Sequence, residues 1–377
     1  MSKILLITNI YPPQIGGPST FINQFARFLA GKGHRVTVVC VSEKKHPELD
    51  QKEKFIVKRI TPGRFKIQFH MRKWEILSRY ILANNTILVN GLEAESSTIC
   101  TFLKKKYILK IVGDWAWEYA RNNSLTHLNI DEFQYQQKLS PAILAVRDQR
   151  NYNVKNASLV YVPSNYLKKI VEGWGKESDK IVVINNGVAL DGEFNNNLSV
   201  SDNNILSIIF IGRITNWKGI DLLLLAIKDV TGVEVKICGD GPELTASIEL
   251  NKKLKNTNVT FLGKVPAVEV KTHLQKADVL VLPSLYEGLS HTVLEAMAYG
   301  VPSIISNVGG NPELVNHGYN GLLFDPYDYM QLQDCIIKLR DSRNYLAELS
   351  SNCYKFVEDF DKFITYKQVE ELICSKH

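Results

Sequence analysis

The chain has 377 residues, of which 45% are hydrophobic and 22% are charged, which suits a soluble globular protein of two domains. The apolar start at Ile4–Ile7 is too short for a signal sequence, no run approaches the roughly 20 apolar residues of a membrane helix, and the cysteines and histidines are too scattered for a metal site. The net charge of +6 is uneven, because residues 1–185 carry 28 Lys and Arg against 15 Asp and Glu, whereas residues 186–377 carry 17 against 24. We therefore expect a cytoplasmic protein without a metal, whose first half meets an anionic partner.

Short β-branched apolar runs alternate with helical patterns along the first half of the chain. The expected strands cover Ile4–Asn9, Arg35–Val41, Phe55–Ile60, Thr86–Val89, Tyr107–Val112, Leu159–Pro163 and Ile181–Ile184. The expected helices include Ser19–Ala30, Lys73–Ala83 and Tyr166–Glu172. An aromatic, polar stretch runs from Asp114 to about Pro141, and we expect a lid or binding loop there. Its side chains Trp115, Trp117 and Tyr119 either stack on the rings of a bound ligand or anchor the loop to the core.

The same alternation resumes in the second half. The expected strands cover Ser207–Ile211, Glu234–Cys238, Val259–Leu262, Val279–Leu282, Ser303–Ser306 and Gly321–Phe324. The expected helices include Ile220–Lys228, Leu244–Leu254, Glu269–Gln275 and Met330–Leu339. Uninterrupted apolar strands that alternate with helices are typical of parallel sheets covered on both faces. Two such series predict an α/β protein with two doubly wound, Rossmann-like domains.

A polar, Asn-rich stretch marks the expected join between the domains, near residues 187–204. The segment Asp191–Asn197 and the following Ser201–Asn204 contain few apolar side chains and do not suit a packed element. We therefore assign residues 1–187 to the first domain and residues 188–357 to the second.

Two clusters of small and charged residues follow strands, at the edge where open α/β sheets bind ligands. After the first strand, Gly16 and Gly17 allow close approach of the backbone to a ligand, and Ser19 is placed to cap the next helix. An ordinary βα turn is the alternative. After the first strand of the second half, Arg213 and Lys218 form a pair of cations that can hold a diphosphate. A solvated loop is the alternative there.

Two carboxylates flank a small-residue turn after the strand Val279–Leu282. The turn Gly288-Leu289-Ser290 would present free backbone N–H groups at a helix N-terminus, which attracts anions. Glu287 precedes the turn, and Glu295 lies one helical turn later with its side chain leaning back toward it. Backbone amides that can bind phosphates, next to carboxylates that can bind hydroxyl groups, suit a nucleotide-sugar as the ligand. The alternative is that Glu287 is a turn residue and Glu295 an exposed helix residue.

In this order the motifs resemble those of retaining glycosyltransferases with the GT-B fold (glycosyl transferases group 1, family 4 type), which include many bacterial mannosyl-, glucosyl- and N-acetylglucosaminyltransferases. The resemblance covers nearly the whole chain. Its segments are Gly16-Gly17, Val162-Pro163-Ser164, Ile184-Asn185-Asn186-Gly187-Val188, Gly212-Arg213, Lys218-Gly219, Gly239-Asp240-Gly241-Pro242, Phe261-Leu262-Gly263, Pro283-Ser284, Glu287-Gly288, Glu295-Ala296-Met297-Ala298 and Gly309-Gly310. It implies two Rossmann-like domains facing across a cleft, with acceptor bound by the first and donor by the second. It also implies that the last helix, at about residues 358–377, packs back on the first domain.

The resemblance assigns roles in holding the donor. Arg213 and Lys218 would bind the diphosphate in place of a metal, so no cofactor is expected. Glu295 would hold the ribose hydroxyls, and Glu287 would face the transferred sugar.

Backbone groups complete the site that the resemblance implies. The amides of Gly288, Leu289 and Ser290 would contact phosphate and sugar, and the loop of Gly16 and Gly17 would approach the diphosphate from the first domain. The family commonly retains the anomeric configuration, with the leaving phosphate taking the proton of the acceptor.

One position departs from the family pattern. Many members have a His at the end of the strand that matches Tyr107–Val112, whereas this chain has Gly113-Asp114-Trp115. Asp114 is the natural substitute as a catalytic hydrogen-bonding partner for the donor sugar or the acceptor hydroxyl. A turn or helix-capping aspartate is the alternative.

A basic, aromatic segment lies between residues 58 and 80. Its cations are Lys58, Arg59, Arg64, Lys66, Arg72, Lys73 and Arg79, and its aromatic residues are Phe65, Phe69, Trp74 and Tyr80. Such a surface suits an anionic membrane face or a phosphate-bearing lipid acceptor. A solvated helix face is the alternative.

The resemblance implies a metal-independent, retaining glycosyltransferase, and the basic first half places it at the inner face of the cell membrane. It would move a hexose or N-acetylhexosamine from a nucleotide-sugar, with UDP as the first choice and GDP as the second, to a saccharide or lipid-linked saccharide in cell-envelope polysaccharide synthesis. Two other functions stay open. One is a nucleotide-sugar epimerase of the same fold. The other is a basic nucleic-acid-binding protein without enzymatic activity, although the acidic second half and the lack of a nucleic-acid motif argue against it.

Overall fold

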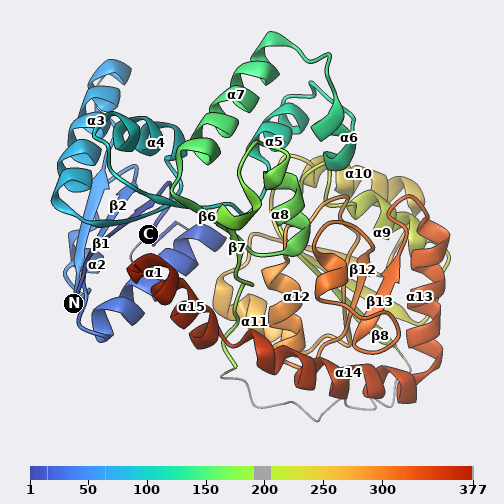
Figure 1. The fold of residues 1–377 in the computed structure, drawn as a ribbon. Coiled ribbons are helices and arrows are strands. Elements are labelled where there is room, and N and C mark those ends of the chain that lie inside the picture. The colour runs from blue at the N-terminus through green and yellow to red at the C-terminus, as the bar shows by residue number, and fades with distance from the viewer. Residues whose placement is uncertain (15, 64, 191–204, 376–377) are drawn as a thin grey trace. The chain divides into compact units, whose positions relative to one another are not determined.

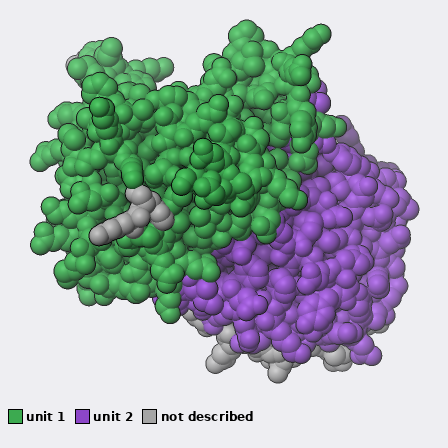
Figure 2. Space-filling model, in the orientation of Figure 1, with its two compact units in different colours: residues 1–126, 131–184, 365–377 green, residues 127–130, 185–364 purple. Residues whose placement is uncertain are grey.

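The computed structural model describes residues 1–14, 16–63, 65–190 and 205–375, and its chain divides into two compact units. Unit 1 comprises residues 1–126, 131–184 and 365–377, and unit 2 comprises residues 127–130 and 185–364 (Figure 2). Of the expected join at residues 187–204, residues 191–204 lie outside the described part of the chain.

Unit 1 is built on a parallel sheet, of which Figure 1 labels β1, β2, β6 and β7. The sheet has seven strands in the order β3-β2-β1-β4-β5-β6-β7. Its strands are β1 (Lys3–Thr8), β2 (Arg35–Val41), β3 (Ile56–Ile60), β4 (Thr86–Asn90), β5 (Ile108–Lys110), β6 (Leu159–Val162) and β7 (Ile181–Val183). Its helices are α1 (Gly17–Gly31), α2 (Pro47–Asp50), α3 (Lys66–Ala83), α4 (Glu93–Phe102), α5 (Trp115–Asn122), α6 (Ile130–Tyr135), α7 (Pro141–Asn156), α8 (Asn165–Glu172), the 3-10 helix η1 (Ser178–Lys180) and most of α15 (Lys362–Cys374).

Unit 2 is built on a six-stranded parallel sheet in the order β10-β9-β8-β11-β12-β13. Its strands are β8 (Leu206–Ile211), β9 (Val233–Cys238), β10 (Val259–Gly263), β11 (Val279–Leu282), β12 (Ser303–Ser306) and β13 (Gly321–Phe324). Its helices are α9 (Ile220–Ala226), α10 (Leu244–Leu254), α11 (Ala267–Gln275), α12 (His291–Ala298), α13 (Tyr329–Asp341), α14 (Arg343–Val357) and the 3-10 helices η2 (Asn311–Glu313) and η3 (Glu358–Phe360). The predicted fold class, α/β with two Rossmann-like domains, is confirmed.

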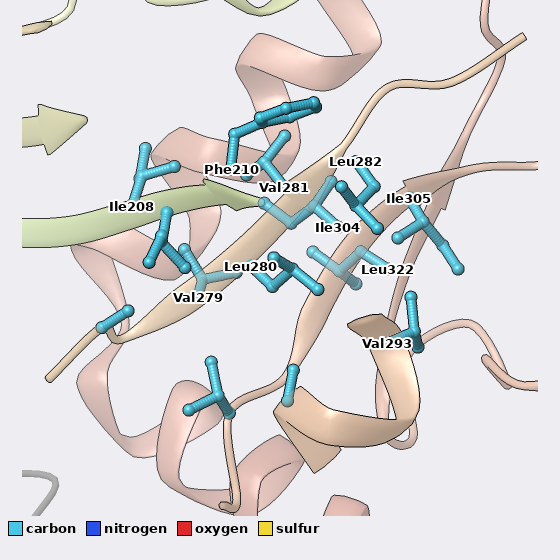
Figure 3. Close-up of a cluster of buried hydrophobic side chains, with 14 of the residues drawn as sticks. Ile208, Phe210, Val279, Leu280, Val281, Leu282, Val293, Ile304, Ile305 and Leu322 are labelled. Carbon is cyan, nitrogen blue, oxygen red and sulfur yellow. The ribbon is translucent and has the colours of Figure 1, made fainter. Parts of the chain in front are cut away.

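The core of unit 2 explains why its central strands are apolar at every position. All four residues of β11 are buried, and side chains from both faces of the sheet enter the same core. Figure 3 shows these side chains beside those of β8, β12 and β13, with Val293 of α12 packed against them. Burial on both faces removes the alternation of polar and apolar residues that a half-exposed strand would show.

The stretch from Asp114 to about Pro141, expected as a lid or binding loop, has regular secondary structure. It contains the two helices α5 and α6. Trp117 is 1% exposed, and Trp115 packs edge-on against Trp174 with the ring centroids 6.3 Å apart. The two Trp side chains therefore belong to the packing of unit 1, whereas Tyr119 is exposed.

The end of the chain leaves unit 2 and joins unit 1. Residues 188 and 360–362 first pair in unit 2, where the Val188 amide donates to the Phe360 carbonyl over 2.8 Å and the Lys362 amide donates to the Val188 carbonyl over 2.9 Å. Helix α15 then packs on α1, where the Tyr366 hydroxyl bonds to Gln24 over 2.9 Å. No helix in the described ranges is long and apolar enough to cross a membrane.

Candidate functional site

The candidate site lies at the carboxyl ends of β8, β11 and β12, which are neighbours in the sheet of unit 2. The loop after β8 carries Arg213 and Lys218, and the loop after β11 carries Glu287. The two loops are joined by a hydrogen bond of 2.7 Å from the Leu285 amide to the Trp217 carbonyl. Adjacent parallel strands therefore bring together side chains that are about 70 residues apart in the chain.

Lys218 and Glu287 form a partly buried ion pair. The Nζ atom of Lys218 lies 2.5 Å from Oε1 of Glu287, and the two side chains are 19% and 12% exposed. The hydroxyl of Ser284 donates to the same carboxylate oxygen over 2.7 Å. The glycine after Lys218 is required here, because a Cβ on Gly219 would lie 2.0 Å from the Pro283 carbonyl oxygen.

The glycine pair after β12 supports the backbone of Glu287. The Gly310 amide donates to the Glu287 carbonyl over 2.9 Å. Gly309 has a φ of +59°, and a Cβ at this position would lie 2.2 Å from the same carbonyl oxygen. Only glycine allows this approach without strain, so the Gly309-Gly310 loop helps to position Glu287.

The N-terminus of α12 follows directly. The Ser290 hydroxyl accepts a hydrogen bond of 3.4 Å from the Val293 amide and caps the helix. The Leu289 carbonyl is held by the side-chain amide of Asn186 over 2.9 Å. The backbone amides of Leu289 and Ser290 have no hydrogen-bond acceptor within the described part of the chain, and such amides at a helix N-terminus attract anions.

The two remaining predicted residues of this unit keep exposed side chains. Arg213 is exposed and forms no ion pair with the residues that the structure describes. Glu295, in the second turn of α12, is also exposed, yet desolvation by the surrounding protein raises the pKa of its carboxyl above the ordinary value. The edge thus combines a free cation, a paired cation, two carboxylates and free amides, which suits a ligand that carries both phosphates and hydroxyl groups.

Gly16 and Gly17 lie in unit 1, at the start of α1. Gly16 is the N-cap residue, and Gly17 is the first residue of the helix. Ser19 does not cap α1 as the sequence suggested, because its hydroxyl donates instead to the Gln14 carbonyl over 2.6 Å. The helix thus begins two residues earlier than predicted.

Asp114, the candidate catalytic carboxylate, is the N-cap residue of α5. This carboxylate is 0% exposed and caps α5 through bonds of 3.0 and 3.3 Å from the Ala116 and Trp117 amides. Its second oxygen accepts bonds of 2.9 Å from Gln134 and 2.5 Å from Arg150. A fully buried carboxylate with four donors has no free position for a sugar hydroxyl in this conformation, so the helix-capping alternative accounts for it.

Arg150 is the closest partner of the buried Asp114 carboxyl. Its side chain is 1% exposed, and its guanidinium lies 4.0 Å from the centroid of the Trp174 ring. Burial lowers the pKa of Arg150, and the charge of Asp114 opposes this shift.

Two of the cations assigned to a basic surface are buried. Arg59 is held by Asp50, with a closest N–O distance of 2.8 Å, and Lys73 is paired with Glu95. Arg64 lies outside the described residues. Lys66, Arg72 and Arg79 are exposed along α3.

Sequence reasoning gave no role to Ser284 or Asn186, although both stand in segments that it singled out. Ser284 is 0% exposed and Asn186 is 5% exposed. Both residues are polar and follow closely after an apolar strand. This pattern in the sequence could have identified them as candidates.

Comparison with known proteins gives a consistent result. Residues 193–356 match the family described as glycosyl transferases group 1. An uncharacterized glycosyltransferase of Methanocaldococcus jannaschii, MJ1178, is 31% identical over 55% of this chain, and the match spans only 57% of that relative. The amylovoran biosynthesis glycosyltransferase AmsK of Erwinia amylovora is 25% identical over 94% of this chain and 90% of its own. The crystal structure of Anabaena HepE in complex with UDP and glucose has a TM-score of 0.81 at 18% identity, with 100% of both chains covered, and shares the fold.

Proposed function

We propose that this chain is a retaining, metal-independent glycosyltransferase of cell-envelope polysaccharide synthesis. The match of residues 193–356 to the glycosyl transferases of group 1 and the fold shared with solved structures support this proposal. The enzyme moves a hexose or N-acetylhexosamine from a nucleotide-sugar to a saccharide or lipid-linked saccharide. The observation that carries this proposal is the edge of unit 2 at which Lys218, Glu287 and the N-terminus of α12 meet.

The donor is held by complementary charges and hydrogen bonds. Arg213 and Lys218 bind the diphosphate together with the amides of Leu289 and Ser290, and Glu295 binds the ribose hydroxyls. Glu287 contacts the hydroxyl groups of the sugar. UDP is the first choice of nucleotide, since the similar structure of Anabaena HepE contains UDP, and GDP is the second.

Transfer replaces one bond to the anomeric carbon by another. The acceptor oxygen forms a bond to this carbon on the face from which the diphosphate leaves, so the configuration is retained. The bond from the anomeric carbon to the phosphate oxygen breaks, its electron pair stays on the diphosphate, and a diphosphate oxygen takes the proton of the acceptor. Lys218 and Arg213 stabilise the charge that develops on the diphosphate, which is the part usually played by a metal ion.

The exposed face of α3 supports contact with an anionic membrane. Ile67, Met71 and Trp74 are 70%, 68% and 41% exposed, and their spacing of four and three residues places them along one face of the helix. Lys66 and Arg72 flank them and are exposed as well. Apolar side chains that enter the interface beside cations that pair with anionic headgroups suit a peripheral enzyme acting on a lipid-linked acceptor.

Two substitutions test the donor site. Arg213→Ala and Glu295→Ala should each lower transfer from the preferred nucleotide-sugar by at least about 100-fold, the loss typical of a group that stabilises the departing charge or orients the donor. Both side chains are exposed, so the unfolding temperature should stay within about 2 °C of the wild-type value. Full activity in either variant would refute its role, and activity that disappears in excess chelator would refute the metal-independent mechanism.

The preferred nucleotide is found by a thermal-shift screen of UDP, GDP and their sugars. A ligand present at 100 times its dissociation constant stabilises the folded protein by about 2.7 kcal/mol. Incubation with the donor alone then separates transfer from epimerisation, because an epimerase converts the nucleotide-sugar without an acceptor. A salt-sensitive shift of DNA in a gel, without any nucleotide effect, would instead favour the nucleic-acid-binding alternative.

A further inference from the structure

One of the two cations proposed to hold the donor's diphosphate is already engaged in an ion pair. Lys218 lies 2.5 Å from Oε1 of Glu287, and this same oxygen accepts the hydroxyl of Ser284 over 2.7 Å. A diphosphate that recruits Lys218 must therefore displace the carboxylate of Glu287. Since both side chains are more than four-fifths buried, solvent screens this competition only in part.

The two partners of this pair differ in how firmly they are held. Ser284 is 0% exposed. Its carbonyl accepts the hydroxyl of Ser306, whose own carbonyl accepts the side-chain amide of Asn311 over 2.9 Å. Glu287 is anchored through Ser284 and through the Gly310 amide, at 2.9 Å.

Lys218 has no comparable anchor. Glu287 is the only partner of its ammonium within the described part of the chain, and four methylene groups allow the ammonium to move. When the pair opens, Lys218 is therefore the side chain that moves, and Glu287 is the one that stays.

We propose that Glu287 competes with the diphosphate for Lys218, and that this competition favours the intact donor over the spent nucleotide; the proposal rests on the function given above. When the nucleotide-sugar binds, Lys218 moves to the diphosphate. Ser284 keeps Glu287 in place, and a sugar hydroxyl replaces Lys218 as its second partner. After transfer the sugar is gone, so Glu287 lacks this partner and recaptures Lys218. The diphosphate then loses a cation, faces a carboxylate, and leaves more readily.

Competition for Lys218 predicts that losing the Glu287 carboxylate increases the affinity for the nucleoside diphosphate. A simple binding role for Glu287 does not predict such an increase. Glu287→Gln removes the competing charge, so UDP or GDP, whichever the protein prefers, should bind about tenfold more tightly, as expected when one charge-assisted contact is released. The nucleotide-sugar should gain much less or lose affinity, because it also loses a charged partner for its hydroxyl group. Transfer should slow, with product release no longer aided by the carboxylate.

A double-mutant cycle identifies the cause. Isothermal titration of the full chain with UDP and GDP is carried out for the wild type, Glu287→Gln, Lys218→Met and the double variant. In the Lys218→Met background, Glu287→Gln should raise the affinity for the diphosphate much less than in the wild type. What remains is the direct repulsion between the Glu287 carboxylate and the bound anion. Glu370→Gln is the matched control, because it removes the carboxylate of another Lys–Glu pair, with Lys32 at 2.6 Å, and changes the net charge equally. This control should leave the affinity for the diphosphate within about twofold.

Ser284→Ala tests the positioning role separately. Removing the hydroxyl should lower kcat about tenfold, because the carboxylate loses its fixed donor, while the dissociation constant of the diphosphate changes by less than about threefold. A change in both KM and kcat together with a lower unfolding temperature would show that Ser284 serves only in packing. That result would overturn its role in positioning Glu287.

The outcomes separate the two proposals. Weaker or unchanged diphosphate binding in Glu287→Gln, in a protein whose wild type binds nucleotide and transfers sugar, overturns the competition and leaves the glycosyltransferase intact. A wild type that neither binds UDP or GDP nor transfers sugar overturns both.

Discussion

Replacing Asp114 by Asn distinguishes a structural carboxylate from a catalytic one. Asn retains an oxygen that accepts the Ala116 and Trp117 amides, so the cap of α5 survives. At the other oxygen, however, it places an NH₂ group against the Gln134 amide and the Arg150 guanidinium, which are both donors. The substitution leaves the guanidinium of Arg150 buried, with no carboxylate beside it.

The cost can be worked out from this geometry. Breaking one partner of a buried ion pair typically costs about 3–5 kcal/mol, and both side chains here are at most 1% exposed. For a folding unit of roughly 150–250 residues, each kcal/mol lowers the unfolding temperature by about 2–4 °C. We therefore expect Asp114→Asn to unfold about 10 °C below the wild type, with kcat of the folded protein within about threefold.

The control is Asp328→Asn, in which the same change is made at the partly exposed N-cap of α13. Asn and Asp are nearly equal as N-caps, so this variant should lose less than about 0.5 kcal/mol. The double variant Asp114→Asn with Arg150→Met should recover part of the loss, because it removes the orphaned charge. Thermal unfolding followed by circular dichroism and initial transfer rates give both quantities. A wild-type unfolding temperature together with a 100-fold loss of kcat in Asp114→Asn would refute the structural assignment and restore the catalytic one.

Two further predictions concern pH. Lys110, 5% exposed, has its ammonium 3.4 Å from the centroid of the Phe21 ring, and burial lowers its pKa from 10.5 to about 7. Between about pH 7 and pH 10.5 the Lys110 side chain is protonated in the unfolded chain but not in the folded one, so the free energy of unfolding rises with pH over this range. Below pH 7 the full cost of burying the ammonium is present. The shift corresponds to about 5 kcal/mol, of which the ring offsets about 2. Lys110→Met should thus stabilise the protein by about 3 kcal/mol in urea unfolding at pH 7 and much less at pH 10. A stabilisation that does not change with pH would contradict this cause. For Glu370, desolvation raises the pKa of the carboxyl, but hydrogen bonds from Lys32 and His34 outweigh it and hold the pKa below 4.5. The stability that the ionised carboxylate contributes is present above about pH 4.5 and is lost as the pH falls through the lowered pKa. Glu370→Gln should therefore lower the free energy of unfolding by about 0.5–1 kcal/mol at pH 7 and leave it unchanged near pH 2. An equal loss of stability at both pH values would exclude the ion pair as its source.

The sequence predicted the fold class because the relevant signal is local. A strand buried on both faces must be apolar along its length, as Val279–Leu282 is, and helices must occupy the gaps between parallel strands. The same rule places ligand-binding residues after strands, so Lys218 and Glu287 could be selected as candidates without coordinates. The helices α5 and α6 were missed because their aromatic residues resemble a binding loop in composition, and only their burial identifies them as packing elements.

The pairing of side chains was decided by the tertiary structure alone. By itself the sequence determined two series of parallel strands and the chemical types available at their ends. It could not determine that Asp114 meets Arg150, 36 residues away, or that Glu287 shares one oxygen between Lys218 and Ser284. Such contacts depend on the order of strands in the sheet and on rotamers that the surrounding packing selects, and neither leaves a pattern in the local sequence. Whether a carboxylate caps a helix or faces a ligand is therefore settled by what folding brings to its second oxygen.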